Sequence, residues 1–182
     1  IMDKYISKIE KVISKEKCND LIAKVEKSEM FEWSKKFGYF GTYGYFTDKK
    51  YNWLLKVMDE HIVGYSEKHK FLHPKYNQNP YYKKWGMCES FNIQKYEPGQ
   101  FYALGEHMEH GRSEVCAKRL LAWMIYLNDI KKEGGTCWPQ QEYVSVPRAG
   151  DMYIWPAGWT HSHYGIAAPE ETKYLLTGWC TF

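Results

Sequence analysis

The sequence predicts an α+β protein in which helices come first and the C-terminal half forms a β-sandwich or barrel. Helical periodicity ends near residue 70, and from Trp85 onward short runs of alternating or continuous apolar residues follow one another. Aromatic residues make up 18% of the chain, with 8 Trp and 16 Tyr, which favours strands and a deep core or pocket with aromatic walls. Helices followed by many short strands are typical of this fold class.

The N-terminal part predicts an edge strand and two helices. Residues 2–13 alternate loosely between apolar and charged side chains, as a half-buried edge strand does. Ser14 is a suitable N-cap for a helix running to about Ser28, with an apolar stripe at Cys18, Leu21, Ile22 and Val25. A second helix is expected from about Asp48 to Lys70, with a buried stripe at Leu54, Leu55, Met58 and Ile62. We expect both helices to cover one face of a sheet.

The remaining segments predict loops and short strands. Residues 31–46 are rich in Gly, Tyr and Phe and are interpreted as irregular structure or short strands, and Pro74 with residues 77–80 marks a loop. The apolar run 120–127 is typical of a strand buried on both faces. Further strands are expected at about 91–96, 136–138, 142–147, 151–155 and 173–182.

Length and charge limit the classes of function. At 182 residues the chain is most simply one domain, residues 1–182, with helical support over about 1–75 and a β-core over about 80–182. The net charge is only +3, with 25 basic and 22 acidic residues interspersed. These totals give no electrostatic support for a nucleic-acid or anionic-membrane partner.

The cysteines and the hydropathy pattern predict a setting for the protein. Five scattered cysteines form no Cys-x-x-Cys pair, so neither a disulfide framework nor a zinc clip is indicated. No apolar run reaches the length of a signal peptide or a membrane span. We therefore expect a soluble, unexported protein in the reducing cytoplasm.

His107-Met108-Glu109 is the candidate for chemistry. In an extended strand, side chains two residues apart point the same way, so His107 and Glu109 can converge on one ion while Met108 faces away. A third ligand is available from His161 or His163. Two imidazoles and one carboxylate on one face of an octahedron are the ligand set of non-haem Fe(II) oxygenases. The sequence thus points toward oxidation chemistry.

Several motifs over residues 86–182 occur in the order found in one known family. They are Tyr96-Glu97-Pro98-Gly99-Gln100, Arg119 with Tyr126-Leu127-Asn128-Asp129, Gly134-Gly135-Thr136, Val146-Pro147 with Gly150-Asp151, and the segment from Lys173 to Trp179. With them the chain resembles the 2-oxoglutarate and Fe(II)-dependent dioxygenases, specifically the prolyl 4-hydroxylase-like group with its small bacterial and phage members. Their ordered co-occurrence is far more specific than any single motif.

The resemblance implies a double-stranded β-helix, or jelly roll, with helices packed on the outer face of one sheet. It implies Fe(II) held by His107, Glu109 and His163, with 2-oxoglutarate and O2 as co-substrates and ascorbate as an accessory reductant. The family more often has Asp where this chain has Glu109, whose stem is one methylene longer. Ligation then requires the strand to lie slightly further away. A carboxylate here argues against a halogenase, in which it is absent.

The resemblance also assigns the co-substrate and substrate residues. Lys173 follows His163 by the spacing at which the family's basic residue binds the far carboxylate of 2-oxoglutarate, which favours His163 over His161. Tyr96 and Tyr126 are expected to line the same pocket. By strand alternation Thr177 faces the same side as Lys173. The substrate is expected near Trp179 and Arg119.

For function, the resemblance implies hydroxylation of an unactivated C–H bond, with a prolyl residue in a peptide or protein as the leading substrate. The alternatives are a hydroxylase of a free amino acid or other small molecule, and a catalytically inactive jelly-roll module that binds a metal or a peptide. Oxidative repair of nucleic acid is disfavoured by the near-neutral charge and by the absence of the Arg-x5-Arg signature.

Overall fold

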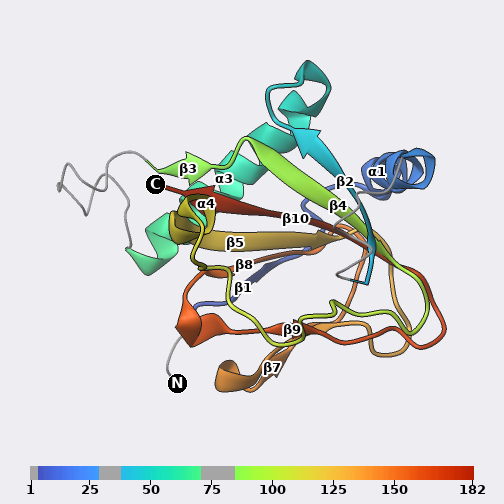
Figure 1. Ribbon diagram of the computed structural model, residues 1–182. Helices are drawn as coiled ribbons and strands as arrows, with labels where there is room; N and C mark the ends of the chain where they lie inside the picture. The colour runs from blue at the N-terminus through green and yellow to red at the C-terminus, as the bar shows by residue number, and fades with distance from the viewer. Residues whose placement is uncertain (1–3, 29–37, 71–84) are drawn as a thin grey trace.

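The computed structural model describes residues 4–28, 38–70 and 85–182, and the strands within them form two antiparallel sheets (Figure 1). The larger sheet follows the order β1-β8-β5-β10-β4-β2, with β3 also paired to β10. Its strands are β1 (Ser7–Ile9), β8 (Met152–Pro156), β5 (Arg119–Tyr126), β10 (Lys173–Thr181), β4 (Ser90–Tyr96), β2 (Phe40–Tyr45) and β3 (Gly86–Met87). The smaller sheet follows the order β7-β6-β9, with strands β7 (Tyr143–Val144), β6 (Thr136–Trp138) and β9 (Tyr164–Gly165).

Both predicted helices are confirmed. Helix α1 (Lys15–Lys27) begins at Ser14, whose side-chain oxygen accepts a hydrogen bond from the Lys17 amide at 3.3 Å. Helix α3 (Asn52–His69) follows the 3₁₀ turn η1 (Lys49–Tyr51) and ends at Lys70, which adopts a left-handed conformation with φ 51°. Short helical turns also occur at α4 (Glu114–Ala117), η3 (Pro139–Gln141) and η4 (Trp159–His161). No helix among the described residues has both the length and the apolar character needed to cross a membrane.

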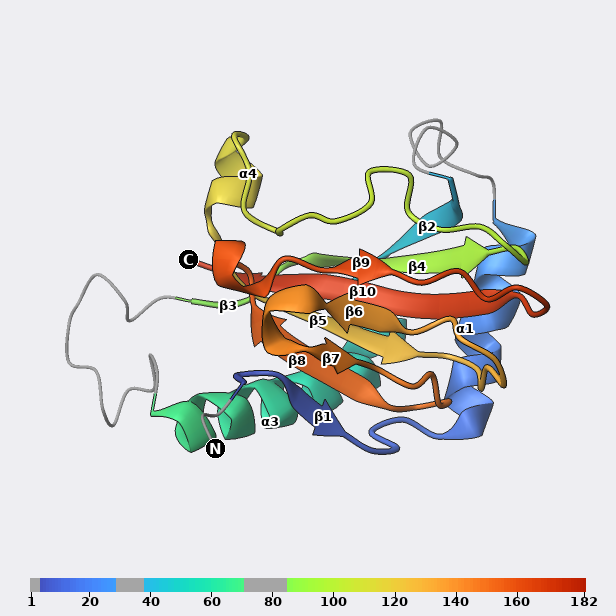
Figure 2. The ribbon, with the colours of Figure 1, turned by 90° about the horizontal axis from the view of Figure 1, so that it is seen from below.

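The helices and the smaller sheet pack on opposite faces of the larger sheet. Figures 1 and 2 show α1 and α3 on one side of it and β6, β7 and β9 on the other. On the helix side, the buried core joins Leu21 of α1 and Met58 of α3 to sheet residues such as Ile125 and Leu176. The core between the two sheets is dominated by aromatic side chains, namely Tyr39, Tyr96, Tyr126, Trp138, Tyr153 and Trp155. The α+β class is confirmed, and the helices cover one face as expected.

Most of the expected strands are present, but one of them is much shorter than expected. Strands were correctly expected at β4, β5, β6, β8 and β10. The strand expected over residues 142–147 is only the two-residue β7. The loop at Pro74 and residues 77–80 lies outside the described residues, as does the first part of the 31–46 segment.

β2 is a regular six-residue strand despite its two glycines. Its Gly44 is required by packing, because a Cβ there would lie 2.0 Å from the Phe91 ring of the neighbouring strand. Glycine in this position allows the aromatic ring to lie against the backbone.

Candidate metal centre and co-substrate cavity

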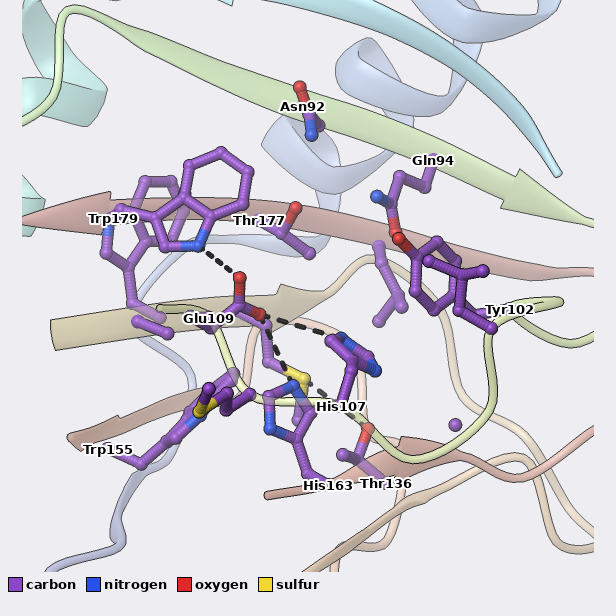
Figure 3. A pocket seen from close by; sticks show the side chains of 18 of the residues that line it. Asn92, Gln94, Tyr102, His107, Glu109, Thr136, Trp155, His163, Thr177 and Trp179 are labelled. Carbon is purple, nitrogen blue, oxygen red and sulfur yellow. Dashed lines mark hydrogen bonds and ion pairs between the residues drawn. The ribbon is translucent and has the colours of Figure 1, made fainter. Parts of the chain in front are cut away.

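His107, Glu109 and His163 converge in the cavity between the sheets (Figure 3). One possible ligand atom from each lies within 4.8 Å of the others. Glu109 Oε1 is 3.3 Å from His163 Nε2 and 3.8 Å from His107 Nε2. Two imidazole nitrogens and one carboxylate oxygen therefore surround one point, as the sequence predicted.

The backbone that presents these side chains is not the extended strand that was expected. His107 and His163 form an isolated antiparallel bridge, in which each amide donates to the other residue's carbonyl at 2.9 Å. The amide of Glu109 then donates to the Ala157 carbonyl at 3.1 Å, just beyond β8. The segment that carries His107 and Glu109 is therefore held by one β-bridge and by a hydrogen bond to the end of β8, and it is not part of a regular strand.

The hydrogen bonds of the two imidazoles select the tautomer that binds a metal. His107 Nδ1 lies 2.8 Å from the Gly105 carbonyl, and His163 Nδ1 lies 3.0 Å from the His161 carbonyl. A carbonyl can only accept, so each Nδ1 carries a hydrogen, and Nε2 is the ring nitrogen left to bind a metal. Anchoring of the far ring nitrogen in this way is typical of metal-ligating histidines. The two Nε2 atoms and the Glu109 carboxylate oxygen are therefore arranged so that one cation could bind between them.

Ionisation of Glu109 and His107 agrees with this. Burial alone would raise the pKa of Glu109, but the neighbouring His163 and His107 and the positive charge of Arg119 hold that pKa at about 2. Burial is the largest cause that lowers the pKa of His107, and the neighbouring His163 lowers it further. A charged carboxylate and a neutral imidazole are the forms that coordinate a divalent metal.

His161, the alternative third ligand, points away from the centre. It ends the 3₁₀ turn η4, so the alternation expected for a strand does not apply. Its Nε2 lies 2.9 Å from the Lys4 carbonyl, and its Nδ1 lies 3.0 Å from Thr160 Oγ1. The structure therefore brings His163, and not His161, to His107 and Glu109. The His161 ring instead hydrogen-bonds to the backbone of the N-terminal segment at Lys4.

A cavity of about 350 Å³ adjoins the three side chains. Strand β10 contributes Lys173, Leu175, Thr177 and Trp179, which alternate onto the same face. Strand β4 contributes Asn92, Gln94 and Tyr96 in the same way, of which the sequence analysis singled out only Tyr96. The β4 alternation that placed Tyr96 could also have indicated Asn92 and Gln94.

Lys173 is a buried cation at one end of this lining. Its side chain is among the fully buried ones, and its ammonium donates to the Ile166 carbonyl at 2.9 Å. The same ammonium lies 5.0 Å from the centre of the Tyr96 ring. Within the described part of the chain no carboxylate pairs with it. Burial lowers its pKa to about 8. A buried ammonium without a carboxylate is costly, and an anionic ligand would offset that cost.

The two tyrosines occupy different places. Tyr96 lines the cavity, and its hydroxyl donates to Gln94 Oε1 at 3.2 Å. Tyr126 does not line the cavity. Its hydroxyl lies 2.7 Å from Ser145 Oγ and 3.1 Å from Thr136 Oγ1, and Thr136 itself lines the cavity, so the approach of Tyr126 to a co-substrate stays a prediction. Its hydroxyl is already satisfied inside the core between the sheets.

Arg119 and Trp179 contact a candidate ligand directly. Trp179 Nε1 donates to Glu109 Oε2 at 2.7 Å, and Arg119 Nη1 donates to the same oxygen at 3.1 Å. Both side chains also line the cavity. The sequence analysis expected them near a substrate and missed their contact with Glu109, because Arg119 follows it by ten residues outside any regular repeat and Trp179 follows it by 70.

Comparison with known proteins decides the family. A family model described as the 2OG-Fe(II) oxygenase superfamily matches residues 91–181, half of the chain. The chain belongs to this superfamily. A sequence comparison with curated proteins gives no match.

Solved structures similar to this oxygenase include two prolyl hydroxylases of similar length. The viral collagen prolyl hydroxylase of Paramecium Bursaria Chlorella virus-1, in complex with 2OG, has a TM-score of 0.69 at 20% identity, covering 97% of this chain and 95% of that one. A Pseudomonas putida prolyl-4-hydroxylase has a TM-score of 0.69 at 16% identity, covering 97% and 92%. A Trichoplax adhaerens prolyl hydroxylase has a TM-score of 0.62 at 12% identity, covering 98% and 84%. These likenesses show the fold.

The superfamily and the triad imply Fe(II) and 2-oxoglutarate, and the residues present fit both. Two Nε2 lone pairs and one carboxylate oxygen form the facial donor set for Fe(II). Lys173 is a buried cation in the same cavity that pairs with no carboxylate of the described residues, which suits a dicarboxylate ligand.

We expect 2-oxoglutarate binding by this oxygenase to depend on pH through the shifted pKa of Lys173. A role of the ammonium in binding the far carboxylate predicts that the affinity of the metal-loaded protein falls as pH rises above about 8, by about tenfold per pH unit at most. Calorimetric titration with 2-oxoglutarate from pH 7 to 9.5 measures this. An affinity that is independent of pH over that range would show that the Lys173 charge does not hold the co-substrate.

The same shift sets the pH dependence of stability without co-substrate. The pKa of Lys173 is about 8 in the folded protein and about 10.4 in an unfolded chain, so between these values the unfolded state binds more protons. The contribution of Lys173 to the free energy of unfolding therefore rises with pH across that window.

Proposed function

We propose that this oxygenase hydroxylates an unactivated C–H bond of a prolyl residue in a peptide or protein. The single observation that carries the enzymatic part is the shared cavity in which the His107, Glu109 and His163 triad and the buried Lys173 ammonium both lie. The structures to which the chain is similar are named as prolyl hydroxylases, and this supports a prolyl substrate.

The cavity rim supports a peptide rather than an enclosed metabolite. Leu104 and Met108 line the cavity and are 59% and 44% exposed, so the cavity reaches the surface through apolar side chains. An apolar rim at the mouth of a site can take side chains that flank a reacting residue. A free amino acid would leave this rim uncovered.

We further propose that residues 1–182 act as one domain and that its two sheets are the two layers of a double-stranded β-helix. The larger sheet supplies β4, β5 and β10 to the cavity, while β6 and β9 of the smaller sheet supply Thr136 and Gly165. Trp138 of β6 packs against Trp155 of β8 with ring centres 5.1 Å apart, which ties the layers together. Helices α1 and α3 support the outer face.

In the mechanism we propose, Fe(II) supplies the oxidation: O2 and 2-oxoglutarate yield succinate and CO2, and one oxygen atom enters the substrate C–H bond. The protein's part is to orient the reactants. The Lys173 ammonium would pair with the far carboxylate of 2-oxoglutarate, directing the keto-acid end toward the triad. The backbone carbonyls of Gly105 and His161 hold the two Nε2 atoms toward the same point.

We infer that the cavity walls limit water around the reacting atoms. Trp155 lies edge-on to the His163 ring with centres 5.0 Å apart, and the ring centres of Tyr102 and His107 are 4.7 Å apart. Each imidazole is thus flanked by an aromatic ring. A dry site strengthens the pairing of Lys173 with a carboxylate and limits side reactions.

Turnover with defined substrates tests the proposal. We expect succinate release with Fe(II), 2-oxoglutarate and O2 to rise when Pro-containing peptides are added, with one oxygen atom gained by the peptide in mass spectrometry. The matched control is the same peptide with Ala in place of Pro. Free proline is a second control, which tests whether a peptide is needed. Oxidation of free amino acids alone would contradict a peptide substrate. Binding of metal and peptide without any succinate would identify a binding module instead.

A further inference from the structure

The two oxygens of Glu109 have different surroundings. Oε1 faces the two histidines, whereas Oε2 accepts from Trp179 Nε1 at 2.7 Å (Figure 3). Oε2 also accepts from Arg119 Nη1 at 3.1 Å. Arg119 Nη1 is also 3.2 Å from the backbone carbonyl of Glu109. Oε2 therefore already has two donors on the side away from the imidazoles.

The two donors support each other and stand on neighbouring strands. The Arg119 guanidinium lies 3.7 Å from the centre of the Trp179 ring, within cation–π range. Arg119 begins β5 and Trp179 lies on β10, which pairs with β5 on either side of a register shift between Cys180 and Thr181. The His110 ring also contacts the Arg119 carbonyl. The sheet thus fixes the positions of both donors relative to Glu109.

The two hydrogen bonds to Oε2 matter because a glutamate side chain could otherwise bind a metal through both oxygens. Its longer, more flexible stem allows both oxygens to turn toward one cation, and bidentate binding would occupy a coordination position that the co-substrate or O2 needs. The side chain of Glu109 is only 12% exposed and that of Arg119 only 17%, so their charge-assisted contact is poorly screened. Turning Oε2 toward the metal would break two such hydrogen bonds.

We propose that Arg119 and Trp179 are positioning residues that restrict Glu109 to coordination through Oε1 alone. The inference rests on the proposed metal site and adds to it the reason why Glu109 can serve there. Their contact with Oε2 keeps one coordination position open without requiring either side chain to touch the metal.

Co(II) is the probe, because its visible spectrum reports the number and type of ligands without turnover. We compare the wild type with Trp179→Phe, which keeps the ring but removes the N–H donor, and with Arg119→Lys, which keeps the charge but loses the planar fork. Trp53→Phe on α3 is the matched control, since Trp53 packs on the helix side of the sheet. We expect both site variants to change the Co(II) spectrum and to weaken 2-oxoglutarate binding to the Co(II) protein by about 10- to 100-fold. The control should change neither.

A double-mutant cycle with Glu109→Asp separates this role from simple loss of packing. The shorter Asp withdraws the carboxylate from the two donors, so Trp179→Phe should have little further effect on the spectrum in that background. Additive effects, or variants with the wild-type Co(II) spectrum, would overturn the inference while leaving the metal site intact. Failure of the wild type to bind Co(II) through the triad would overturn the metal site itself, and the inference with it.

Discussion

Replacing His163 with Ala is expected to abolish succinate formation and to weaken Fe(II) or Co(II) binding by more than about 100-fold, beyond the usual effect of losing a supporting contact. The variant leaves only His107 and Glu109 to hold the metal. It also removes the group closest to Glu109 Oε1, at 3.3 Å. Calorimetric metal titration and a succinate assay measure the two effects separately.

The matched control for His163→Ala is His161→Gln. His161 is equally buried and lies two residues away, but its ring nitrogens contact the Lys4 carbonyl and Thr160. Gln keeps a side-chain N–H donor for the Lys4 carbonyl. Metal affinity should stay close to that of the wild type in this control. If His161→Gln lost the metal and His163→Ala retained it, the ligand assignment would be wrong.

The Lys173→Met variant is expected to separate co-substrate binding from stability. Without the ammonium, the far carboxylate of 2-oxoglutarate would be buried unpaired, which costs about 2–5 kcal/mol, or roughly 30- to 5,000-fold in affinity. Unfolding without co-substrate should occur at the same or a higher temperature, because Met removes a buried charge that no described carboxylate neutralises. Calorimetric titration and thermal unfolding at pH 7 measure both.

Lys95→Met provides the contrasting lysine. Lys95 lies on β4 beside Tyr96, but its ammonium pairs with Glu26 at 3.0 Å and Glu97 at 2.8 Å. We expect this control to leave 2-oxoglutarate affinity unchanged. Unchanged 2-oxoglutarate affinity in Lys173→Met, or strong destabilisation of that variant at pH 7, would contradict the role given to Lys173.

Local sequence patterns predicted the elements that depend on local signals. The Ser14 cap and the apolar stripe behind it define α1, and the run at 120–127 is buried as β5. Strand alternation correctly placed Thr177 and Trp179 on the face that carries Lys173. In each case the periodicity of the backbone and burial of one face or both decide the outcome.

The errors arise where tertiary contacts replace that periodicity. His107 and Glu109 were expected on a strand, but one bridge to His163 and a hydrogen bond to Ala157 hold them. The contacts of Arg119 and Trp179 with Glu109 depend on how the loop before β5 folds back against β10. No local pattern encodes such contacts.

The most direct test of the central claim is calorimetric titration of the wild type with 2-oxoglutarate, with and without Mn(II) as an inert substitute for Fe(II), in the absence of O2. If the triad holds one metal beside the Lys173 ammonium, one 2-oxoglutarate should bind per chain, and binding should be much tighter with the metal present. Equal affinity with and without metal, or no binding in either case, would contradict a metal centre and a co-substrate site that share one cavity.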